Sequence, residues 1–130
     1  LDWPIAEILN YLVQGLAADL MKFYRLLLWK NLKPYKDGFY PVKWICTVHD
    51  SVELDVDNNP ELCYNILQVM IETWKELPEY CKEKYGFDLN VPFTGEAKFG
   101  FNLHDDSMMK FNPLSFYTDW EYICLKQPLL

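Results

Sequence analysis

Several features that would quickly assign a chain to a class of protein are missing from these 130 residues. No run of about 18 apolar residues is present, so no membrane span is predicted. The start has no signal-peptide pattern, and the chain contains no internal repeat or low-complexity tract. The four cysteines form no C-x-x-C pair, so we expect reduced, buried thiols rather than a zinc site.

Basic charge is also scarce, because 12 lysines and arginines stand against 19 aspartates and glutamates, and the formal net charge is −7. Alone, this argues against an independent nucleic-acid-binding module, since phosphate binding usually shows as a basic surface. A domain that holds divalent metal ions with carboxylates is an exception, because basic residues of other domains can hold the phosphates. The acidity therefore favours a metal-bearing piece of a larger protein.

What the chain does contain is apolar and aromatic side chains, at 51% and 17% of its residues. This is enough for a packed core, so disorder is not expected for the body of the chain. A length of 130 residues allows one domain at most, or part of one. Because the first residue is Leu1 rather than Met, we expect the chain to be cut, processed or trimmed from a longer polypeptide.

Two stretches have the apolar spacing of helices. Residues 16–32 carry leucines at helical spacing, and Pro34 and Gly38 follow as end signals. A second helix is predicted to begin after Asn59, a good N-cap residue that is followed by proline. We expect Pro78 to kink or break this second helix.

Residues 42–48 and 51–56 are predicted to form two strands joined only by His49 and Asp50, which both tolerate positive φ. The hairpin would raise these two residues to the rim of the sheet, where a ligand can reach them. The face expected to pack on helices carries Ile45, Thr47, Val52, Leu54 and Val56, and the other face carries Cys46, Ser51 and Glu53.

Residues 91–101 alternate with period two, as in a half-buried strand, after Gly86 closes the helical stretch. The order of helix, hairpin, helix and strand predicts an α+β fold with an antiparallel sheet. Residues 104–130 are polar, aromatic and punctuated by proline, and no architecture is predicted for them.

Three stretches, in the right order, resemble the C-terminal palm of family A (DNA polymerase I-like) DNA polymerases. NYLVQGLAADLMK (10–22) is similar to the N-x-P-x-Q-G-x-A-A-D entry to a long palm helix. VHDSVEL (48–54) resembles the V-H-D-E motif C, and VPFTGEAKFG (91–100) resembles the terminal strand. Each motif alone is modest, but the three in series on a matching helix, hairpin and strand are specific.

The resemblance implies an α+β fold in which an antiparallel palm sheet with a catalytic hairpin packs on long helices. Residues 1–103 would be a partial palm, and 104–130 would be a C-terminal tail. Asp50 matches the motif C aspartate, which with a second aspartate binds two Mg²⁺ ions. Magnesium is a hard ion that prefers carboxylate oxygen and can bridge the attacking and leaving oxygens. The alternative for Asp50 is an ordinary turn aspartate.

Three further residues match DNA-contacting positions of the family. His49 matches a histidine at the primer terminus, and Gln14 and Asn10 match residues that reach the minor groove of the duplex. Every base pair offers acceptors in that groove, so an amide can test pairing without reading sequence. The alternatives are a turn or core role for His49 and helix-entry hydrogen bonds for Gln14 and Asn10. Lys22 and Arg25 could reach phosphate, but a solvated helix face is the preferred interpretation.

The sequence also departs from the family pattern. Ser51 stands where the family usually has Glu, so metal geometry would depend on Glu53 or water. Leu12 replaces the usual Pro, and Ala6 stands where the family often has Arg. The first catalytic aspartate, the nucleotide-binding helix and the thumb are absent from the sequence, and one aspartate cannot hold two Mg²⁺ ions in fixed geometry.

We therefore expect one segment of a DNA polymerase that extends a primer 3′ end with deoxynucleoside triphosphates only when an upstream polypeptide supplies the other catalytic carboxylate. The expected location is cytoplasmic, with viral or phage replication in a host cell as one setting, and no membrane partner. The first alternative is a non-catalytic, palm-derived scaffold that binds a polymerase or DNA, which Ser51 and the acidic balance favour. The second is an unrelated α+β domain with a chance His-Asp pair.

Overall fold

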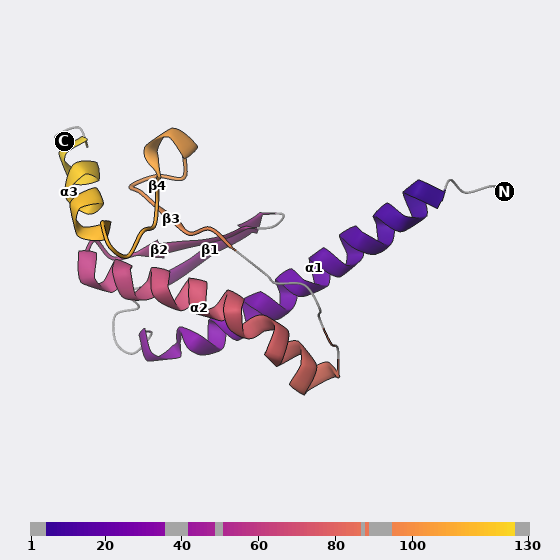
Figure 1. Ribbon diagram of the computed structural model, residues 1–130. Helices are drawn as coiled ribbons and strands as arrows, with labels where there is room; N and C mark the ends of the chain where they lie inside the picture. The colour runs from indigo at the N-terminus through magenta and orange to yellow at the C-terminus, as the bar shows by residue number, and fades with distance from the viewer. Residues whose placement is uncertain (1–4, 36–41, 49–50, 87, 89–94, 127–130) are drawn as a thin grey trace.

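The computed structural model describes residues 5–35, 42–48, 51–86, 88 and 95–126, and in the first helix it describes side chains from residue 15 onward. Its described elements are helices and short antiparallel strand pairs, so the expected α+β class is confirmed (Figure 1). The helices are α1 (Ile5–Asn31), α2 (Pro60–Tyr85) and α3 (Phe116–Lys126), with short 3₁₀ helices η1 (Lys33–Tyr35) and η2 (Asp105–Ser107). The strands are β1 (Val42–Val48), β2 (Ser51–Val56), β3 (Lys98–Phe99) and β4 (Met109–Lys110).

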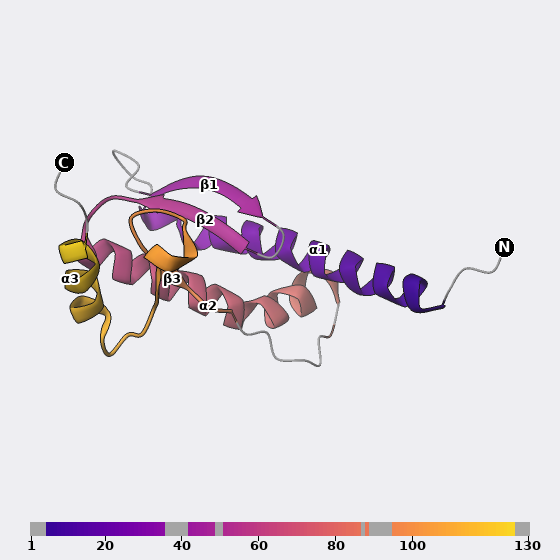
Figure 2. The same cartoon turned by 90° about the horizontal axis from the view of Figure 1, so that it is seen from above.

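Within the described residues, β1 pairs with β2 and β3 pairs with β4, so two small sheets stand in place of the single expected one. Helices α1 and α2 pack against each other and carry the β1–β2 pair (Figures 1 and 2). None of the described helices is both long enough and apolar enough to cross a membrane.

Helix α1 begins at Ile5, well before the residue 16 that the leucine spacing predicts. Its N-terminal half extends away from the rest of the molecule (Figure 1). The described side chains from Gly15 to Asp19 are exposed, and Leu20 is the first buried one. Ile5, Ile8, Leu9 and Leu12 also recur at helical spacing, so the sequence carried a signal for this earlier start.

Helix α2 has the predicted ends. Asn59 caps it, because the Asn59 side-chain oxygen accepts from the backbone N–H groups of Glu61 (3.0 Å) and Leu62 (3.3 Å). Gly86 closes it in the left-handed conformation, with φ 63°.

The expected break at Pro78 is wrong, because α2 continues through it to Tyr85. Proline removes one helical hydrogen bond and crowds the preceding turn. Leu77 and Cys81 on either side are fully buried in the core between the two long helices, and this packing holds the last turns in place. Tertiary contacts thus outweigh the local preference.

Tyr24 joins the two long helices at the centre of this core. The Tyr24 ring, which is 1% exposed, stacks on Trp74 with centroids 4.1 Å apart. The Tyr24 hydroxyl donates to the carbonyl of Met70 at 3.0 Å. Burial raises the pKa of Tyr24 well above its ordinary value. The core of buried residues comprises Leu20, Met21, Tyr24, Leu28, Leu32, Val42, Ile66, Leu77 and Cys81.

The β1–β2 pair has the strand bounds that the sequence predicts, 42–48 and 51–56. Thr47 lies opposite Val52, and Cys46 lies opposite Glu53, so these pairs share faces as expected. The placement of Ile45 on the core face is wrong. The register shifts between Trp44 and Cys46, which leaves Ile45 51% exposed.

A bulge of this kind adds one residue to one strand and reverses the alternation beyond it. Trp44, opposite Leu54, therefore takes the inward position that Ile45 would have had. The alternation of β2 is regular, but that of β1 is not, and a pattern of period two cannot reveal an inserted residue.

The C-terminal segment forms a second core against α2. The buried residues of this core are Cys63, Leu67, Ala97, Phe99, Phe111, Phe116 and Ile123. Ala97 and Phe99 are buried while Glu96 and Lys98 are exposed, which agrees with the predicted alternation, although Phe101 is 43% exposed. Residues 89–94 of the predicted strand lie outside the described part. Residues beyond 103 contribute β4 and α3 and so belong to the same packed unit as β3.

Candidate functional site

The four side chains predicted to form the site lie outside what the structure describes. His49 and Asp50 fall between the described ends of β1 and β2. Asn10 and Gln14 lie within α1, in the part where only the backbone is described. The structure therefore reports on the scaffold that carries these residues.

The end of the strand pair is well defined. Val48 pairs with Ser51, so the ladder reaches the last residue of β1 and the first of β2. His49 and Asp50 are the whole covalent connection between these paired residues.

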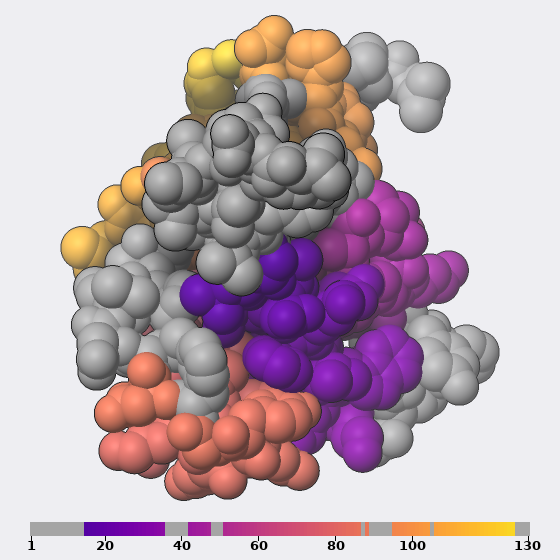
Figure 3. Space-filling model, turned by 90° about the vertical axis from the view of Figure 1, so that its right-hand side faces the viewer, coloured from indigo at the N-terminus to yellow at the C-terminus, as the bar shows by residue number. Residues whose placement is uncertain are grey.

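Helix α1 runs beneath β1 in the opposite direction. Arg25 donates from Nη1 to the Thr47 hydroxyl at 3.4 Å, and one turn later Trp29 meets the Trp44 ring edge-on at 6.1 Å. Followed towards its N-terminus, the helix therefore approaches the C-terminal end of β1. Its N-terminal half extends past that end (Figures 1 and 2). Figure 3 views the molecule from this side, with the described part of α1 between α2 and the strand pair.

Lys22 and Arg25, two of the basic residues of this helix, differ in their surroundings. Lys22 is exposed and forms a 3.7 Å ion pair with Asp19, one turn before it. This agrees with a solvated helix face. Arg25 is half-buried and hydrogen-bonded to Thr47, so the prediction that it lies on a solvated helix face is wrong. Its bond ties α1 to β1 two residues before His49.

Glu53, the carboxylate expected to compensate for Ser51, is engaged by a thiol on the neighbouring strand. The Cys46 thiol donates to Oε2 of Glu53 at 3.1 Å. This hydrogen bond, followed by burial and by the negative charge of Glu53, raises the pKa of Cys46. A thiol with a raised pKa stays protonated at neutral pH and is a poor metal ligand. Sequence reasoning missed this pair, although the alternation does place both residues on the outer face.

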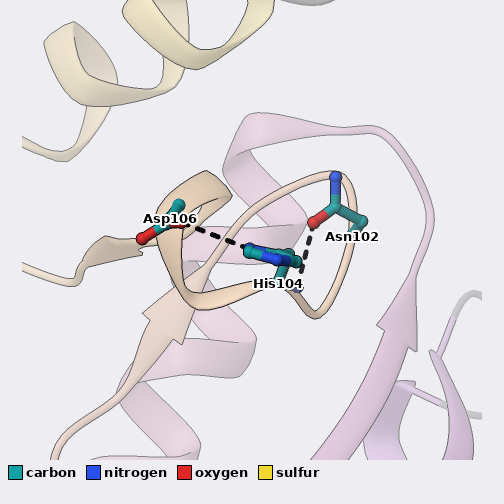
Figure 4. Close-up of polar contacts among 3 residues, drawn as sticks. All are labelled: Asn102, His104 and Asp106. Carbon is teal, nitrogen blue, oxygen red and sulfur yellow. Dashed lines mark hydrogen bonds and ion pairs between the residues drawn. The ribbon is translucent and has the colours of Figure 1, made fainter.

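A second polar group lies on the loop after β3 (Figure 4). The backbone N–H of His104 donates to the Asn102 side-chain oxygen at 2.9 Å, and His104 Nδ1 lies 3.7 Å from Asp106 Oδ2. The two ionisable side chains are 73% and 92% exposed, so their attraction is weak. In the described part of the chain, no three His, Cys, Asp or Glu side chains are grouped as a metal site. The group is a turn structure.

The described residues also form a groove with a volume of about 450 Å³. One wall is formed by residues 52–58 and the other by residues 98–103. Helix α2, Met108 and the α3 residues Trp120 and Ile123 line the rest. The sequence predicts both strands and the helix that line the groove, but it predicts no architecture for residues 104–130, which add Met108, Trp120 and Ile123 to the lining.

Comparison of the chain with protein-family models, with characterised proteins and with solved structures gave no match.

Proposed function

We propose that this chain is the C-terminal palm segment of a family A DNA polymerase and that it contributes Asp50 to a two-metal site for nucleotide addition. The observation that carries the proposal is the β1–β2 pair, in which Val48 and Ser51 are the last paired residues and only His49 and Asp50 lie between them. A catalytic carboxylate for a substrate as bulky as duplex DNA must stand at an accessible edge, and the end of a strand pair is such an edge.

The course of α1 also supports the proposal. This helix carries the Q-G-L-A-A-D stretch, runs beneath β1 and extends past the end where Asp50 belongs. A primer–template duplex held at Asp50 would then lie within reach of the N-terminal half of α1. Gln14 and Asn10 would donate to the minor-groove acceptors that all base pairs share, and His49 would contact the primer terminus.

This chain would supply only part of the ligand set of a magnesium site. Asp50 would hold it, but the described residues provide no group of three ligands, and Glu53 is bonded to Cys46. A second carboxylate must therefore come from an upstream polypeptide, which also brings the basic residues that a chain of net charge −7 lacks. When bound, two Mg²⁺ ions supply Lewis-acid stabilisation of the attacking and leaving oxygens.

The test is an add-back experiment. The purified chain, with a primer–template, Mg²⁺ and all four deoxynucleoside triphosphates, is expected to show no extension. Addition of the polypeptide that carries the upstream palm, fingers and thumb motifs, taken from the same genome, is expected to produce extension. Extension by the isolated chain, or none by the mixture, would refute the proposal.

Ser51 favours a second candidate function, a palm-derived scaffold without catalysis, because the family carboxylate after Asp50 is lost. The same mixture separates the two functions. A scaffold would stimulate a complete polymerase equally well with Asp50 or with Asn at this position, whereas a catalytic segment requires the aspartate.

A further inference from the structure

The basic side chains of this acidic chain are unevenly distributed. Five of the 12 lysines and arginines lie in residues 20–36, and none of the 19 aspartates and glutamates does. The stretch covers the C-terminal part of α1 and η1. In this part of the molecule, which reaches the surface between α2 and the strand pair (Figure 3), the local charge is opposite in sign to that of the whole chain.

Four of these five basic residues share one face of the helix. Lys22, Arg25, Lys30 and Lys33 recur at the spacing of three, four and seven residues that places side chains on the same side. The three lysines are exposed and Arg25 is half-buried, whereas Leu28 on the opposite face is fully buried. We call this face the basic stripe. From its first to its last residue it extends about 16 Å, at about 1.5 Å per residue.

Two exposed apolar side chains are interleaved with these charges. Leu26 is 57% exposed and Trp29 is 51% exposed. The ring of Trp29 meets Trp44 of β1 edge-on, and the hydrogen bond from Arg25 to Thr47 ties the same face of α1 to β1. An indole ring is therefore held in the middle of the basic stripe with half of its surface accessible.

The charge of the stripe is only partly balanced by nearby carboxylates. Lys22 pairs with Asp19 at 3.7 Å, but the two side chains are 63% and 61% exposed, so the attraction is weak. Glu76 of α2 accepts from the Asn31 side chain at 3.3 Å, near the end of the stripe. Within the described part of the chain, no acidic side chain forms an ion pair with Arg25, Lys30 or Lys33.

A line of positive charges with an accessible aromatic ring among them fits a linear polyanion that carries flat apolar groups between its charges. Single-stranded nucleic acid has this chemistry, and proteins bind it with a basic track for the backbone and aromatic rings on which bases stack. The length of the stripe corresponds to about five nucleotides of a stacked strand, at about 3.4 Å each. An acidic peptide has no flat group for Trp29, and a membrane-surface helix separates its apolar face from its charged face.

We propose that the basic stripe binds single-stranded nucleic acid, with phosphates at its lysines and Arg25 and a base stacked on Trp29. The site goes beyond the proposed function, which places a primer–template duplex at the hairpin end and at the N-terminal half of α1. From Arg25, beside Thr47, to Trp29, beside Trp44, the stripe leads away from Asp50. It therefore holds a strand outside the catalytic site.

The experiment measures binding of a fluorescein-labelled thymidine dodecamer to the full chain by fluorescence anisotropy, without metal ion, nucleotide or primer–template. Between 20 and 200 mM KCl, three or four phosphate contacts at about 0.7 each predict a slope of log affinity against log salt of about −2 to −3. Backbone amide shifts, followed by NMR, should be concentrated in residues 22–33.

Lys30→Gln combined with Lys33→Gln removes two contacts. This double variant should bind the dodecamer at least tenfold more weakly at 50 mM KCl, with a slope that is smaller by about 1.4. The matched control is Lys98→Gln combined with Lys110→Gln, which neutralises two exposed lysines of the β3–β4 pair and should change the Kd less than twofold.

Trp29→Leu tests the stacked base. It should weaken binding of the thymidine dodecamer at least fivefold. Binding of an abasic dodecamer, which has the same phosphates and no bases, should change less than twofold. The abasic probe thus also reports whether the variant keeps the stripe intact, and an equal loss with both probes would exclude stacking on Trp29.

Four results would overturn the proposal. The first is the absence of dodecamer binding at 20 mM KCl, and the second is an equal loss in the two lysine double variants, which would show an effect of net charge alone. The third is binding of a twelve-residue polyglutamate as tight as that of the dodecamer, and the fourth is binding of phosphatidylglycerol vesicles in place of the dodecamer.

The same measurements are independent of the proposed function. Dodecamer binding without extension in the add-back mixture would refute the polymerase segment alone. Extension in that mixture without dodecamer binding would refute the basic stripe as a nucleic-acid site alone.

Discussion

Tyr24→Phe tests the contact that joins the two long helices. The substitution removes only the hydroxyl, which donates to the Met70 carbonyl at 3.0 Å, and keeps the ring stacked on Trp74. The Met70 carbonyl lies within α2 and can accept from the helix itself, so it is not left without a donor. The expected loss in the free energy of unfolding at pH 7 is therefore that of one net hydrogen bond, about 1 kcal/mol.

The pH dependence makes this prediction sharper. Burial raises the pKa of Tyr24 above its ordinary value of 10.0, so the native state keeps the proton when the unfolded state has lost it. Above pH 10 the unfolded state binds fewer protons than the native state, and the stability of the wild type falls by up to about 1.4 kcal/mol per pH unit from this group. Phenylalanine has no proton to lose.

The stability difference between the two proteins should therefore shrink above pH 10 and reverse near pH 11. This difference can be measured by urea unfolding of both proteins at pH 7, 10 and 11, followed by circular dichroism. The other titrating groups are the same in both proteins, so their contributions cancel in the difference. A constant difference across this range would show that Tyr24 ionises equally in both states, and the assignment of its buried, neutral hydroxyl would be wrong.

Three other substitutions test the site and the second core. Asp50→Asn in the complete assembly should lower single-turnover nucleotide incorporation roughly a thousandfold or more, because metal stabilisation is worth several kcal/mol. Primer–template affinity, measured on the same preparation, should stay close to unchanged. A loss of incorporation below about tenfold would exclude Asp50 as the metal ligand. Gln14→Ala should cost on the order of 1 kcal/mol in extension from matched or mismatched termini, and unchanged DNA affinity and mismatch discrimination would make Gln14 structural. Gly100→Ala should destabilise the chain by about 1–3 kcal/mol in thermal unfolding, because its Cβ would lie 2.6 Å from the Ser107 carbonyl oxygen. Gly15→Ala, whose Cβ meets nothing within 4 Å, is the control and should stabilise α1.

Local chemistry made parts of the fold predictable. Asn59 and Gly86 fix the ends of α2 through their own side chain and backbone conformation, so the sequence reveals them without tertiary information. The alternation of apolar and polar residues in β2 is also readable from the sequence, because it reflects one inner and one outer face of the strand. By contrast, continuation of α2 through Pro78 depends on the burial of Leu77 and Cys81, which no local pattern contains.

The candidate site was also predictable only in part. That His49 and Asp50 connect two strands follows from their neighbours in the sequence, and the paired ends Val48 and Ser51 agree with it. The hydrogen bond from Cys46 to Glu53 joins two residues that the predicted register already places opposite each other. The hydrogen bond from Arg25 to Thr47 depends on how α1 packs, so it required the structure.

Two surfaces of the molecule make sense together if the chain is completed by another. The N-terminal half of α1 extends from the body, and its described residues before Leu20 are exposed, including Leu16 at 42%. Helices in proteins owe most of their stability to tertiary contacts, and the described residues 15–19 have no buried side chain. The groove beside β2 has an apolar floor that includes Ile66, Leu67 and Ile123. Helix α1 extends past the end of the strand pair at which β1 ends and β2 begins. From that same end, β2 runs along the groove. If the proposed function is correct, an upstream polypeptide that packs on the N-terminal half of α1 would therefore also lie beside the candidate site.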